Sequence, residues 1–536
     1  MAEQILRIDS ALGHSAGPVP ADLAEGLASD NAPLVLQHDS VFASLPPPPP
    51  APGPDFNWGV ALDSFQGTLT DAVPLLQWFF LLYFIALNGG YLLLNLASLF
   101  MIRTYLREQD AASPYLNSGK HEIPISIIMI AGNDVAAAVA RVHAMLQLDY
   151  SEFEVIIVND GSYEPVLKAL VREFSLAPFP EAYRERLPGK HVKAVHASTL
   201  YPGLRLLDKE SGGRADALNV ALNCARYPLF CIMDHDFILQ RDSLSKMGRV
   251  FQNKPTVVAA CASVGVANGC TLHGGYMAGI GLPRAWPALF QIIEDLRNVR
   301  FARMFWSRLN AMLITTRVFG VFHKETVIAA GGFRTDALNE DMELVARIHR
   351  LLRRENKHYH IAYVPDALCW ADAAENWKLL KLQCMNRQVS LAQALEMNRQ
   401  LLLGRGGGAV GWLGFPFIFL FEVMVPWLEV LGYLIMTLLW LSGLISFQAL
   451  WTFLLAVIGL GVMHSTSALL MDEMTLRTNR KLSHALKLFA VALLENLGYR
   501  QLTAFWRVIG TVRMRGQVRC ANSLSAPDSN TRQITA

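Results

Sequence analysis

The sequence predicts an α/β domain inserted between membrane-spanning helices, and three observations lead to this expectation. Only 17% of the 536 residues are charged and 52% are hydrophobic, whereas an ordinary soluble domain has about 25% charged residues. Long uncharged runs lie on both sides of residues 104–404, and within that range short β-rich runs alternate with helical stretches. The composition excludes a disordered chain. The net charge of +2 gives no electrostatic reason to bind nucleic acid, so we expect none as a partner.

Residues 1–73 differ from the rest of the chain. They hold nine acidic residues and a single arginine, Arg7, and the run Pro46–Pro50 is typical of an extended polyproline segment. No basic segment followed by an apolar core lies near Met1, so we expect no cleaved secretory signal. The prediction for residues 1–73 is a disordered, acidic and proline-rich tail.

The first predicted membrane segment covers residues 74–103. Leu75–Ile102 contains no charged residue, and about 20 apolar residues suffice to cross a bilayer. Arg103 and Arg107 follow this run, whereas the tail before it is acidic. The positive-inside rule therefore places the tail outside and residues 104–404 in the cytoplasm. We expect a multi-pass protein of the cell inner membrane.

Hydrophobic segments return at residues 405–472. Val410–Leu444 is long enough for an interfacial helix and a span, and Leu450–Met471 predicts a further span. Glu422 and Glu429 lie within the first of these segments. Because a carboxylate in lipid is costly, we expect both to face protein, water or the headgroup zone.

Residues 473–515 are predicted to form a basic loop and an amphipathic helix on the membrane. The apolar stretch Leu486–Ile509 carries four charged residues. These charges favour a helix, or a pair of helices, that lies on the bilayer over a fourth span. Residues 516–536 are expected to be a disordered tail.

Carboxylates follow three predicted strands of the α/β domain. Ile125–Ile130 leads into Asn133-Asp134, and Phe153–Val158 leads into Asp160. In an open α/β sheet the ligand crevice lies beyond the carboxyl ends of the strands. Asp134 and Asp160 are therefore placed to meet a nucleotide base or ribose, although either residue alone also suits a turn or a helix N-cap.

The third strand, Leu229–Met233, ends in Asp234-His235-Asp236. Two carboxylates at positions i and i+2 can share one hard divalent cation, which in turn binds phosphate oxygens. Before this strand lies the paired-glycine segment 208–219, in which Lys209 and Arg214 offer positive charge suited to a diphosphate. The combination indicates a site for a phosphorylated ligand.

A fourth signal is Gly331-Gly332-Phe333 followed by Asn339-Glu340-Asp341. A carboxylate near a sugar could take the proton from an attacking hydroxyl group. The same residues also suit a helix N-terminus, with Asn339 as the cap and the acids in the first turn. Both interpretations can hold together.

The ordered segments LDYSEFEVIIVNDGS, GGRADALN, ARYPLFCIMDHD, GGFRTDALNEDMEL and YVPDALCW resemble the membrane-embedded family 2 glycosyltransferases. This family includes cellulose synthase, hyaluronan synthase and poly-N-acetylglucosamine synthase. The likeness covers about residues 74–515. It implies a cytosolic GT-A (Rossmann-like) domain, a UDP-sugar donor, a glycan acceptor, membrane lipid as surroundings and polysaccharide-export proteins as partners.

The resemblance also implies roles for the motif residues. Asp341 would be the general base, supported by Glu340, in an inverting single displacement that releases UDP. Asp234 and Asp236 would hold Mg²⁺ or Mn²⁺ against the diphosphate. The positions on the donor side are Asn133, Asp134, Asp160, Lys209, Asp234 and Arg387.

The acceptor side departs from the family pattern. The QxxRW element corresponds to residues 384–388, where Arg387 is kept, Cys384 replaces the Gln and Gln388 replaces the Trp. An amide cannot replace the flat apolar face on which an acceptor sugar stacks. Thr316-Arg317 stands where the family has a small Ser-Gly-Ala type turn.

Three explanations of these departures remain open. The enzyme could use a different acceptor, it could transfer a single sugar, or it could be a weakly active relative kept for partner binding. The main hypothesis is therefore a glycosyltransferase of exopolysaccharide synthesis, and the alternative is a non-catalytic membrane scaffold. A transporter is less favoured, because two or three spans without repeats are too few.

Overall fold

The computed structural model describes residues 58–116, 122–161, 164–234, 236–273, 276–297, 301–313, 319–402, 404, 407–476 and 482–523. Thr68–Ala536 forms one compact unit, and it is described here by itself. The predictions for residues 1–57, Thr316, Arg317 and the basic loop around residues 477–481 lie outside the described residues.

Twelve strands occur in the described part of the chain. Their bounds are β1 (Ile125–Ile130), β2 (Phe153–Asp160), β3 (Leu176–Pro178), β4 (Val192–Ser198), β5 (Leu204–Lys209), β6 (Leu229–Met233), β7 (Ile238–Leu239), β8 (Val257–Val266), β9 (Thr271–His273), β10 (Tyr276–Gly279), β11 (Phe319–His323) and β12 (His360–Ala371). The predicted strands at 125–130 and 229–233 have the observed bounds, and the predicted strand at 153–158 extends by two residues to Asp160.

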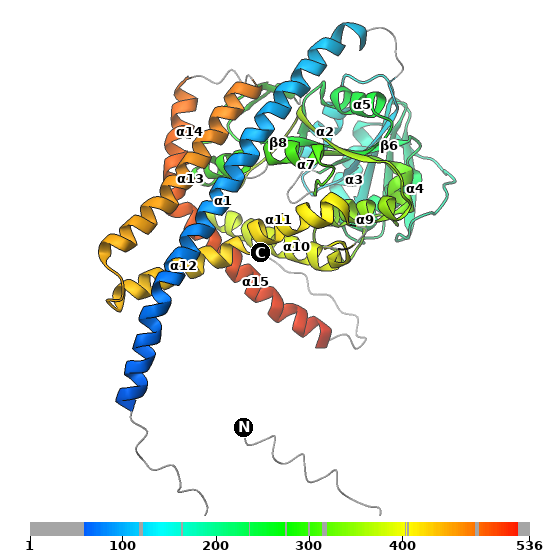
Figure 1. The fold of residues 1–536 in the computed structure, drawn as a ribbon. Helices are drawn as coiled ribbons and strands as arrows, with labels where there is room; N and C mark the ends of the chain where they lie inside the picture. Colours follow the sequence, from blue (N-terminus) through cyan, green and yellow to red (C-terminus); the bar gives the residue numbers. More distant parts are fainter. Residues whose placement is uncertain are drawn as a thin grey trace, which may run out of the picture. The chain divides into compact units, whose positions relative to one another are not determined.

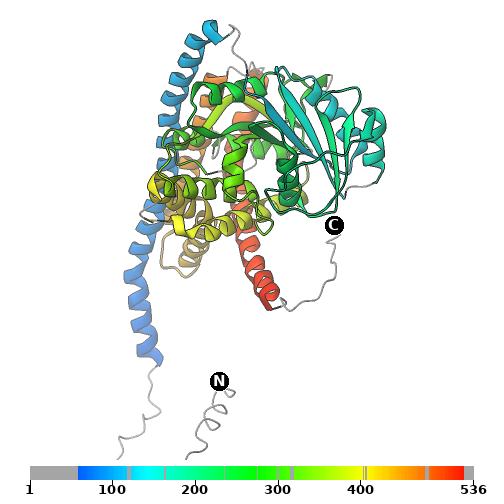
Figure 2. The same ribbon diagram turned by 90° about the vertical axis from the view of Figure 1, so that its right-hand side faces the viewer.

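Ten of these strands form one mixed sheet, and Figure 2 shows strands of this sheet side by side. The strand order is β3-β4-β5-β2-β1-β6-β11-β8-β12-β7, and β5, β2, β1 and β6 are parallel neighbours. β11 runs antiparallel to both β6 and β8. The predicted α/β class is therefore confirmed, and the parallel part of the sheet carries the predicted strand-end carboxylates.

Helices cover both faces of the sheet. Those of the α/β domain are α2 (Val135–Leu146), α3 (Glu164–Glu173), α4 (Arg214–Cys224), α5 (Ser243–Asn253), α6 (Trp286–Asp295), α7 (Phe301–Arg308), α8 (Lys324–Ala329), α9 (Glu340–Arg354) and α10 (Trp377–Met397). Alternate residues of β2 point to opposite sides: Ile156 packs in one core with α4 and α9, and Val155 in another with α2, α3 and α5. This period of two is that of a strand buried on both faces.

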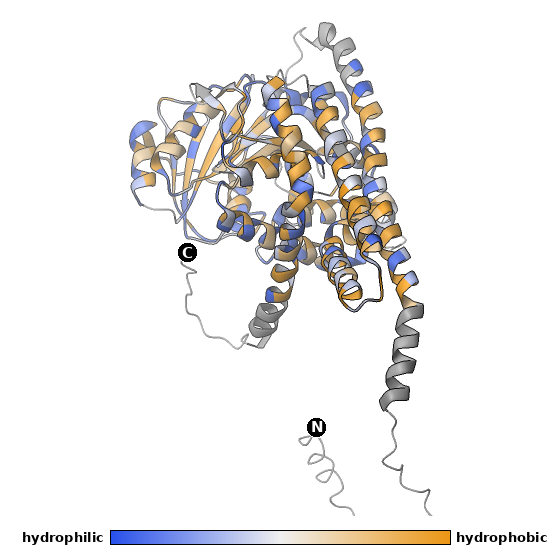
Figure 3. Cartoon of the chain, turned by 90° about the vertical axis from the view of Figure 1, so that its left-hand side faces the viewer, coloured by the Kyte–Doolittle hydropathy of each residue, from blue (hydrophilic) through white to orange (hydrophobic). Residues whose placement is uncertain are grey.

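The remaining helical segments include the long or strongly apolar helices and the short 3-10 and π-helical turns that adjoin them. They are α1 (Trp58–Leu116), η3 (Arg399–Leu401), η4 (Val410–Gly414), α11 (Phe415–Ile418), η5 (Phe419–Val423), α12 (Val425–Leu441), α13 (Phe447–Leu476), α14 (Leu482–Leu494), η6 (Glu495–Tyr499) and α15 (Arg500–Ser523). In the described chain, three stretches are long and apolar enough to cross a membrane: Ala72–Tyr105, Val410–Leu441 and Phe447–Glu473. Figure 3 shows apolar residues along these helices.

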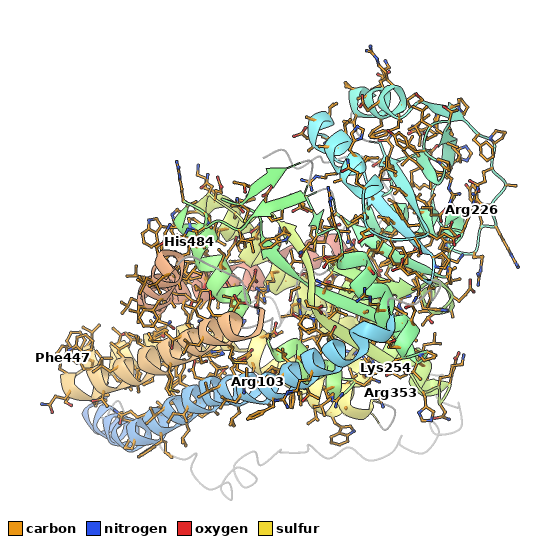
Figure 4. All side chains as sticks on the ribbon, turned by 90° about the horizontal axis from the view of Figure 1, so that it is seen from above. Arg103, Arg226, Lys254, Arg353, Phe447 and His484 are labelled. Atoms are coloured by element: carbon orange, nitrogen blue, oxygen red, sulfur yellow. The ribbon has the colours of Figure 1, made fainter. Side chains whose placement is uncertain are left out.

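The three apolar helices pack against one another. Phe84 of α1 meets Phe453 of α13 edge to face, with ring centroids 5.7 Å apart, and both belong to one apolar cluster that includes Met436 of α12. Figures 1 and 4 show α1 and α13 side by side, with Arg103 on α1 and Phe447 at the end of α13 away from the sheet. These helices flank the α/β domain in sequence, as predicted.

Two predicted tails contain helix in the structure. α1 begins at Trp58, within the predicted tail 1–73, and α15 continues to Ser523, within the predicted tail 516–536. The extension of α15 contains no proline, and the extension of α1 adjoins Pro74, which lies inside that helix. Acidic or polar composition indicated disorder in both extensions, but such composition does not by itself prevent a helix.

Three of the four charged residues of the last apolar stretch, Glu495, Arg500 and Arg507, form ion pairs inside the protein, whereas Lys487 is exposed. Arg500 is paired with Glu429 of α12, and Glu495 lies 2.9 Å from Arg297. Glu429 is 2% exposed, so it faces protein, which is one of the three environments predicted for it. The four charges were the reason to predict a helix on the membrane surface, and the structure pairs three of them inside the protein.

Candidate active site

The site begins at the carboxyl ends of four parallel strands. Lys209 ends β5, Asp160 ends β2, residues 131–134 follow β1 and Asp234 follows β6. β5, β2, β1 and β6 are adjacent in that order. Their parallel registers bring all four ends to the same edge of the sheet, which is where α/β proteins bind ligands.

Asp160 organises the turn that precedes α4. Its carboxylate accepts hydrogen bonds from the backbone N–H groups of Gly212 and Gly213, both at 2.8 Å. Gly213 has φ of 89°, and a Cβ at Gly212 would lie 2.3 Å from Asp216 Oδ2. Gly212 is therefore favoured by the close approach to Asp216, and Gly213 by its positive φ.

Lys209 stabilises this turn through ion pairs with two carboxylates. Its Nζ lies 2.5 Å from Asp160 Oδ1 and 2.6 Å from Asp216 Oδ2, and it donates to the carbonyl oxygen of Glu210 at 2.6 Å. The side chain is completely buried. The structure thus gives Lys209 a positioning role toward Asp160, in place of an ammonium group directed at a ligand.

The position of Asp134 after β1 is explained by a local hydrogen bond at the start of α2. Asp134 is the N-cap of α2 and accepts a hydrogen bond from the backbone N–H of Ala137 at 3.1 Å. Asn133 and Gly132 precede it in the same turn. Asp134 therefore serves as a helix cap, one of the two roles that the sequence left open.

A cleft of about 440 Å³ lies at the end of β6. It brings together predicted residues from three remote segments: Asp234, Glu340, Asp341, Cys384 and Arg387. Apolar residues of β8, among them Val264 and Val266, form another part of its wall. The described residues that line this cleft do not include those at the ends of β1, β2 and β5.

Arg214, the first residue of α4, joins the carboxylates of the cleft. Its Nε donates to Asp234 Oδ1 at 3.1 Å, and its Nη1 lies 3.2 Å from Glu340 Oε2 and 3.6 Å from Asp341 Oδ1. These contacts span the end of β6 and the first turn of α9. The sequence suggested Arg214 only as a positive charge for a diphosphate, and its bridging position depends on segments more than 100 residues apart.

Burial raises the pKa of the Asp341 carboxyl group above its usual range. Arg214 opposes this shift, and Asp234 adds to it. Burial likewise raises the pKa of Glu340, with Asp341 and Asp234 contributing repulsion. Oδ1 of Asp341 is buried and accepts no hydrogen bond within 3.5 Å from the described residues, and Arg214 Nη1 is its ion-pair partner at 3.6 Å. A buried carboxylate oxygen in this position could accept a proton.

Asn339 begins α9 as the sequence predicted. Its side-chain oxygen accepts from the backbone N–H of Met342 at 3.1 Å. Phe333, of the Gly-Gly-Phe segment, exchanges two hydrogen bonds with Asn219 of α4, at 2.7 and 2.8 Å. These bonds link α4 to the segment before α9, a connection that the sequence analysis missed because it involves no local pattern.

The predicted metal ligands are separated by their surroundings. Asp234 lines the cleft beside Arg214. Asp236 instead interacts electrostatically with Arg141. Burial lowers the pKa of Arg141, and the charges of Asp236, Asp372 and Asp134 oppose that shift. In the described residues, no group of three or more His, Cys, Asp or Glu side chains could hold a metal ion. Two aspartates nevertheless suit Mg²⁺ or Mn²⁺ chemically, because such ions bind through one or two carboxylates and complete their shell with water and substrate phosphates.

The acceptor-side predictions divide. Cys384 lines the cleft, and Arg387 does so while its Nη1 lies 3.3 Å from Glu294 Oε1. Gln388 does not line the cleft: it is 3% exposed and its Nε2 donates to the carbonyl oxygen of Val423 at 3.0 Å. Val423 belongs to the π-helical turn η5, which frees backbone carbonyls from the regular pattern. Gln388 instead lines a separate cavity of about 60 Å³ together with Glu294 and Arg387, and its acceptor-side role stays a prediction.

Glu294 is a residue of the site that the sequence analysis missed. It lines the cleft, pairs with Arg387 and Arg507, and accepts from the hydroxyl group of Tyr499 at 3.1 Å. Burial alone would raise its pKa, but the neighbouring arginines bring it to about 2. The sequence signal was weak because its partners lie 93 and 213 residues away.

The fold and the cleft define a class: an α/β domain with a carboxylate-lined cleft at its sheet edge, flanked in sequence by apolar helices. Residues 126–277 match the family model "Glycosyl transferase family 2". The chain therefore contains a family 2 glycosyltransferase domain. The predicted family and the GT-A fold class are confirmed by this match together with the observed sheet.

The relatives found are polysaccharide synthases. Poly-beta-1,6-N-acetyl-D-glucosamine synthase of Staphylococcus epidermidis is 24% identical over 247 residues, covering 46% of this chain and 49% of that protein. The enzyme of the same name from Staphylococcus aureus strain COL is 23% identical over 226 residues, covering 42% and 44%. The chain thus spans about half the length of the curated relatives it matches.

Similar solved structures share little sequence with this chain. A mannosyltransferase from Pyrobaculum calidifontis in complex with GDP-Man and Mn²⁺ has a TM-score of 0.45 at 17% identity, covering 78% of this chain and 99% of that chain. Residues 1–349 of TarS from Staphylococcus aureus, in complex with UDP-GlcNAc, have a TM-score of 0.30 at 15% identity, covering 66% and 90%.

Proposed function

We propose that the protein is an inverting glycosyltransferase that moves a sugar from a UDP-sugar to a growing β-linked glycan or to another acceptor. The observation that carries the proposal is the cleft, which unites Asp234, Glu340, Asp341 and Arg387 from separate segments of the chain. The family match at residues 126–277 and the synthases among the relatives support the reaction class. Exopolysaccharide synthesis is the process in which we place it.

On the donor side, the proposal uses the strand ends. The turn held by Asp160 and Lys209 presents the start of α4, and Asn133 and Asp134 follow the neighbouring strand. We propose that Asn133, Asp134 and Asp160 bind the uridine part of the donor, while the buried Lys209 positions Asp160. Arg214 and Arg387, which both line the cleft, would bind the diphosphate, because guanidinium groups match phosphate oxygens geometrically.

A divalent cation, Mg²⁺ or Mn²⁺, would be held by Asp234 and Asp236 and would neutralise charge on the departing diphosphate. Asp341 would accept the proton of the acceptor hydroxyl group. Its buried Oδ1 accepts no hydrogen bond within 3.5 Å from the described residues, and its raised pKa makes it a stronger base than an exposed aspartate. Glu340, whose Oε2 lies 3.2 Å from Arg214 Nη1, would hold the guanidinium group of Arg214 beside Asp341 in the donor-free protein.

For location, we propose an inner-membrane protein with a cytoplasmic catalytic domain. The three apolar stretches support membrane insertion, and Arg103 with Arg107 after an acidic tail supports the tail outside. The proposed division is a tail at 1–73, a span at 74–103, the transferase domain at 104–404, membrane helices at 405–472, a membrane-associated segment at 473–515 and a tail at 516–536. Polysaccharide-export proteins would be its partners.

The test is UDP release by the purified full-length protein in detergent, with Mn²⁺ or Mg²⁺ and a panel of UDP-sugars. We expect turnover with at least one sugar and a loss of at least 100-fold in Asp341→Asn, the range for general-base removal. Asp336→Asn is the matched control, because Asp336 is an exposed carboxylate paired with Arg334. No turnover with any UDP-sugar, or equal turnover in Asp341→Asn, contradicts the proposal.

The second candidate is a nucleotide-binding membrane scaffold. Two observations favour a scaffold. Gln388 points away from the cleft toward Val423. Among the described residues that line the cleft, none is an aromatic residue on which an acceptor sugar could stack. A scaffold predicts that a UDP-sugar raises the thermal unfolding temperature without any UDP release. Thermal protection accompanied by turnover favours the enzyme.

A further inference from the structure

Arg214 is the point at which the two acidic motifs of the cleft meet. It follows Gly213, whose φ of 89° turns the chain into α4, and its side chain is 29% exposed. The guanidinium group contacts Asp234 after β6 and Glu340 and Asp341 in α9. No other segment of the described chain bridges these two motifs by an ion pair.

The charges in this contact do not balance. Three carboxylates face one guanidinium group, so the cluster carries two excess negative charges when all are ionised. Lys209 is engaged with Asp160 and Asp216, and Arg387 with Glu294. Arg303 also lines the cleft, and the carboxylate that acts on it is Asp295. Among the described residues, Arg214 is the only cationic side chain in ion-pair contact with Asp234, Glu340 and Asp341.

This arrangement gives Arg214 and a divalent cation the same binding partner. Asp234 Oδ1 is the acceptor for Arg214 Nε at 3.1 Å, and Asp234 is also the carboxylate of the paired aspartates that lines the cleft. A guanidinium group on that oxygen repels a second cation placed on the same carboxylate. A diphosphate in the cleft would attract the guanidinium group, since it offers a bidentate anionic partner.

We propose that Arg214 is a positioning residue that holds Asp234, Glu340 and Asp341 together in the donor-free protein and opposes divalent-cation binding until a nucleotide diphosphate draws it away. Nucleotide and cation then bind with positive cooperativity, and each raises the affinity for the other by the same factor. The nucleotide part rests on the proposed function. The cation part requires only the contacts of Arg214.

The experiment measures Mn²⁺ affinity of the full-length protein in detergent, from the electron paramagnetic resonance signal of free Mn²⁺, with and without UDP. Wild type should bind Mn²⁺ weakly alone and at least about 10-fold more tightly with UDP, within the usual range of coupling between sites. Arg214→Met should bind Mn²⁺ about 10-fold more tightly than wild type without UDP and should lose most of the UDP effect.

Matched variants separate this role from general effects of charge. Arg186→Met removes an arginine that is paired with Glu325 on the surface and should behave as wild type. Arg214→Gln serves as a second neutral variant in case the Met variant does not fold. Adding Asp234→Asn to either variant should abolish the gain in Mn²⁺ affinity, because it removes the shared carboxylate.

Equal or weaker Mn²⁺ affinity in both neutral variants without UDP overturns the proposal, as does a UDP effect of unchanged size in them. If wild type does not bind UDP at all, the proposed donor is wrong. The comparison of Mn²⁺ affinity without UDP still decides the role of Arg214 in that case.

Discussion

Replacing Lys209 by Met tests whether this lysine positions the site or contacts the donor. Its Nζ lies 2.5 Å from Asp160 and 2.6 Å from Asp216, and the side chain is completely buried. Without the ammonium group, Asp160 keeps two backbone donors, Gly212 and Gly213. Asp216 keeps one, the N–H of Lys190 at 3.0 Å, and its Oδ2 is left without a partner.

Removing one member of a buried ion pair costs about 3–5 kcal/mol, because a charge is left uncompensated. We therefore expect Lys209→Met to lower the free energy of unfolding by this amount. Adding Asp216→Asn should restore much of the loss, since the orphaned charge is then absent. Lys168→Met is the control: Lys168 pairs with Glu164 at 2.7 Å on the exposed face of α3, and its loss should leave stability essentially unchanged.

The assay is denaturant unfolding of the protein in detergent, combined with UDP affinity for each variant. If Lys209 positions the site, Lys209→Met lowers the free energy of unfolding whether or not UDP affinity changes. Adding Asp216→Asn then restores part of that stability. A variant whose stability lies within about 1 kcal/mol of wild type, but whose UDP affinity falls at least 10-fold, would refute this reasoning and restore a direct donor contact.

Three further predictions follow from buried ionisable groups. Because burial raises the pKa of Asp341, the folded state binds its proton more tightly than the unfolded state, and stability falls as pH rises through the range above the usual pKa of aspartate. Asp341→Asn should therefore be more stable than wild type at pH 7, with the difference shrinking toward pH 4; equal thermal unfolding temperatures at both pH values would contradict this. His349 is fully buried, and burial lowers its pKa from 6.5 to about 4. Stability should fall as pH drops from 6.5 to 4, by up to about 3 kcal/mol, and His349→Gln should lose this component; an unchanged slope in denaturant titrations across that range would argue against it. Glu294→Gln leaves Arg387 and Arg507 without their shared carboxylate and should cost about 3–5 kcal/mol, measured as a shift in the denaturant midpoint, with a loss below 1 kcal/mol counting against the buried network.

Several features of this protein could be predicted from the sequence because they depend on neighbouring residues. The strands at 125–130 and 229–233 are short apolar runs bounded by polar turns, and their pattern is local. Asn339 was predicted as a helix cap for the same reason, and it caps α9. Asp234 follows an apolar strand, so its place at the sheet edge followed from general rules for α/β sheets. Glu340 and Asp341 were predicted in the first turn of the helix that Asn339 caps, and they lie there.

The tertiary structure decided which of these side chains face the cleft and which are used internally. Asp160 and Lys209 hold a turn, Gln388 closes a π-helical carbonyl, and Arg214 bridges the two acidic motifs. Each of these roles depends on a partner that the strand or helix pattern does not specify. Burial and charge pairing depend on which distant segments the fold brings into contact, such as Arg500 with Glu429 across 71 residues. The sequence alone therefore determined the fold class and the family of the domain, whereas the assignment of charges to the cleft or to the interior required the packed structure.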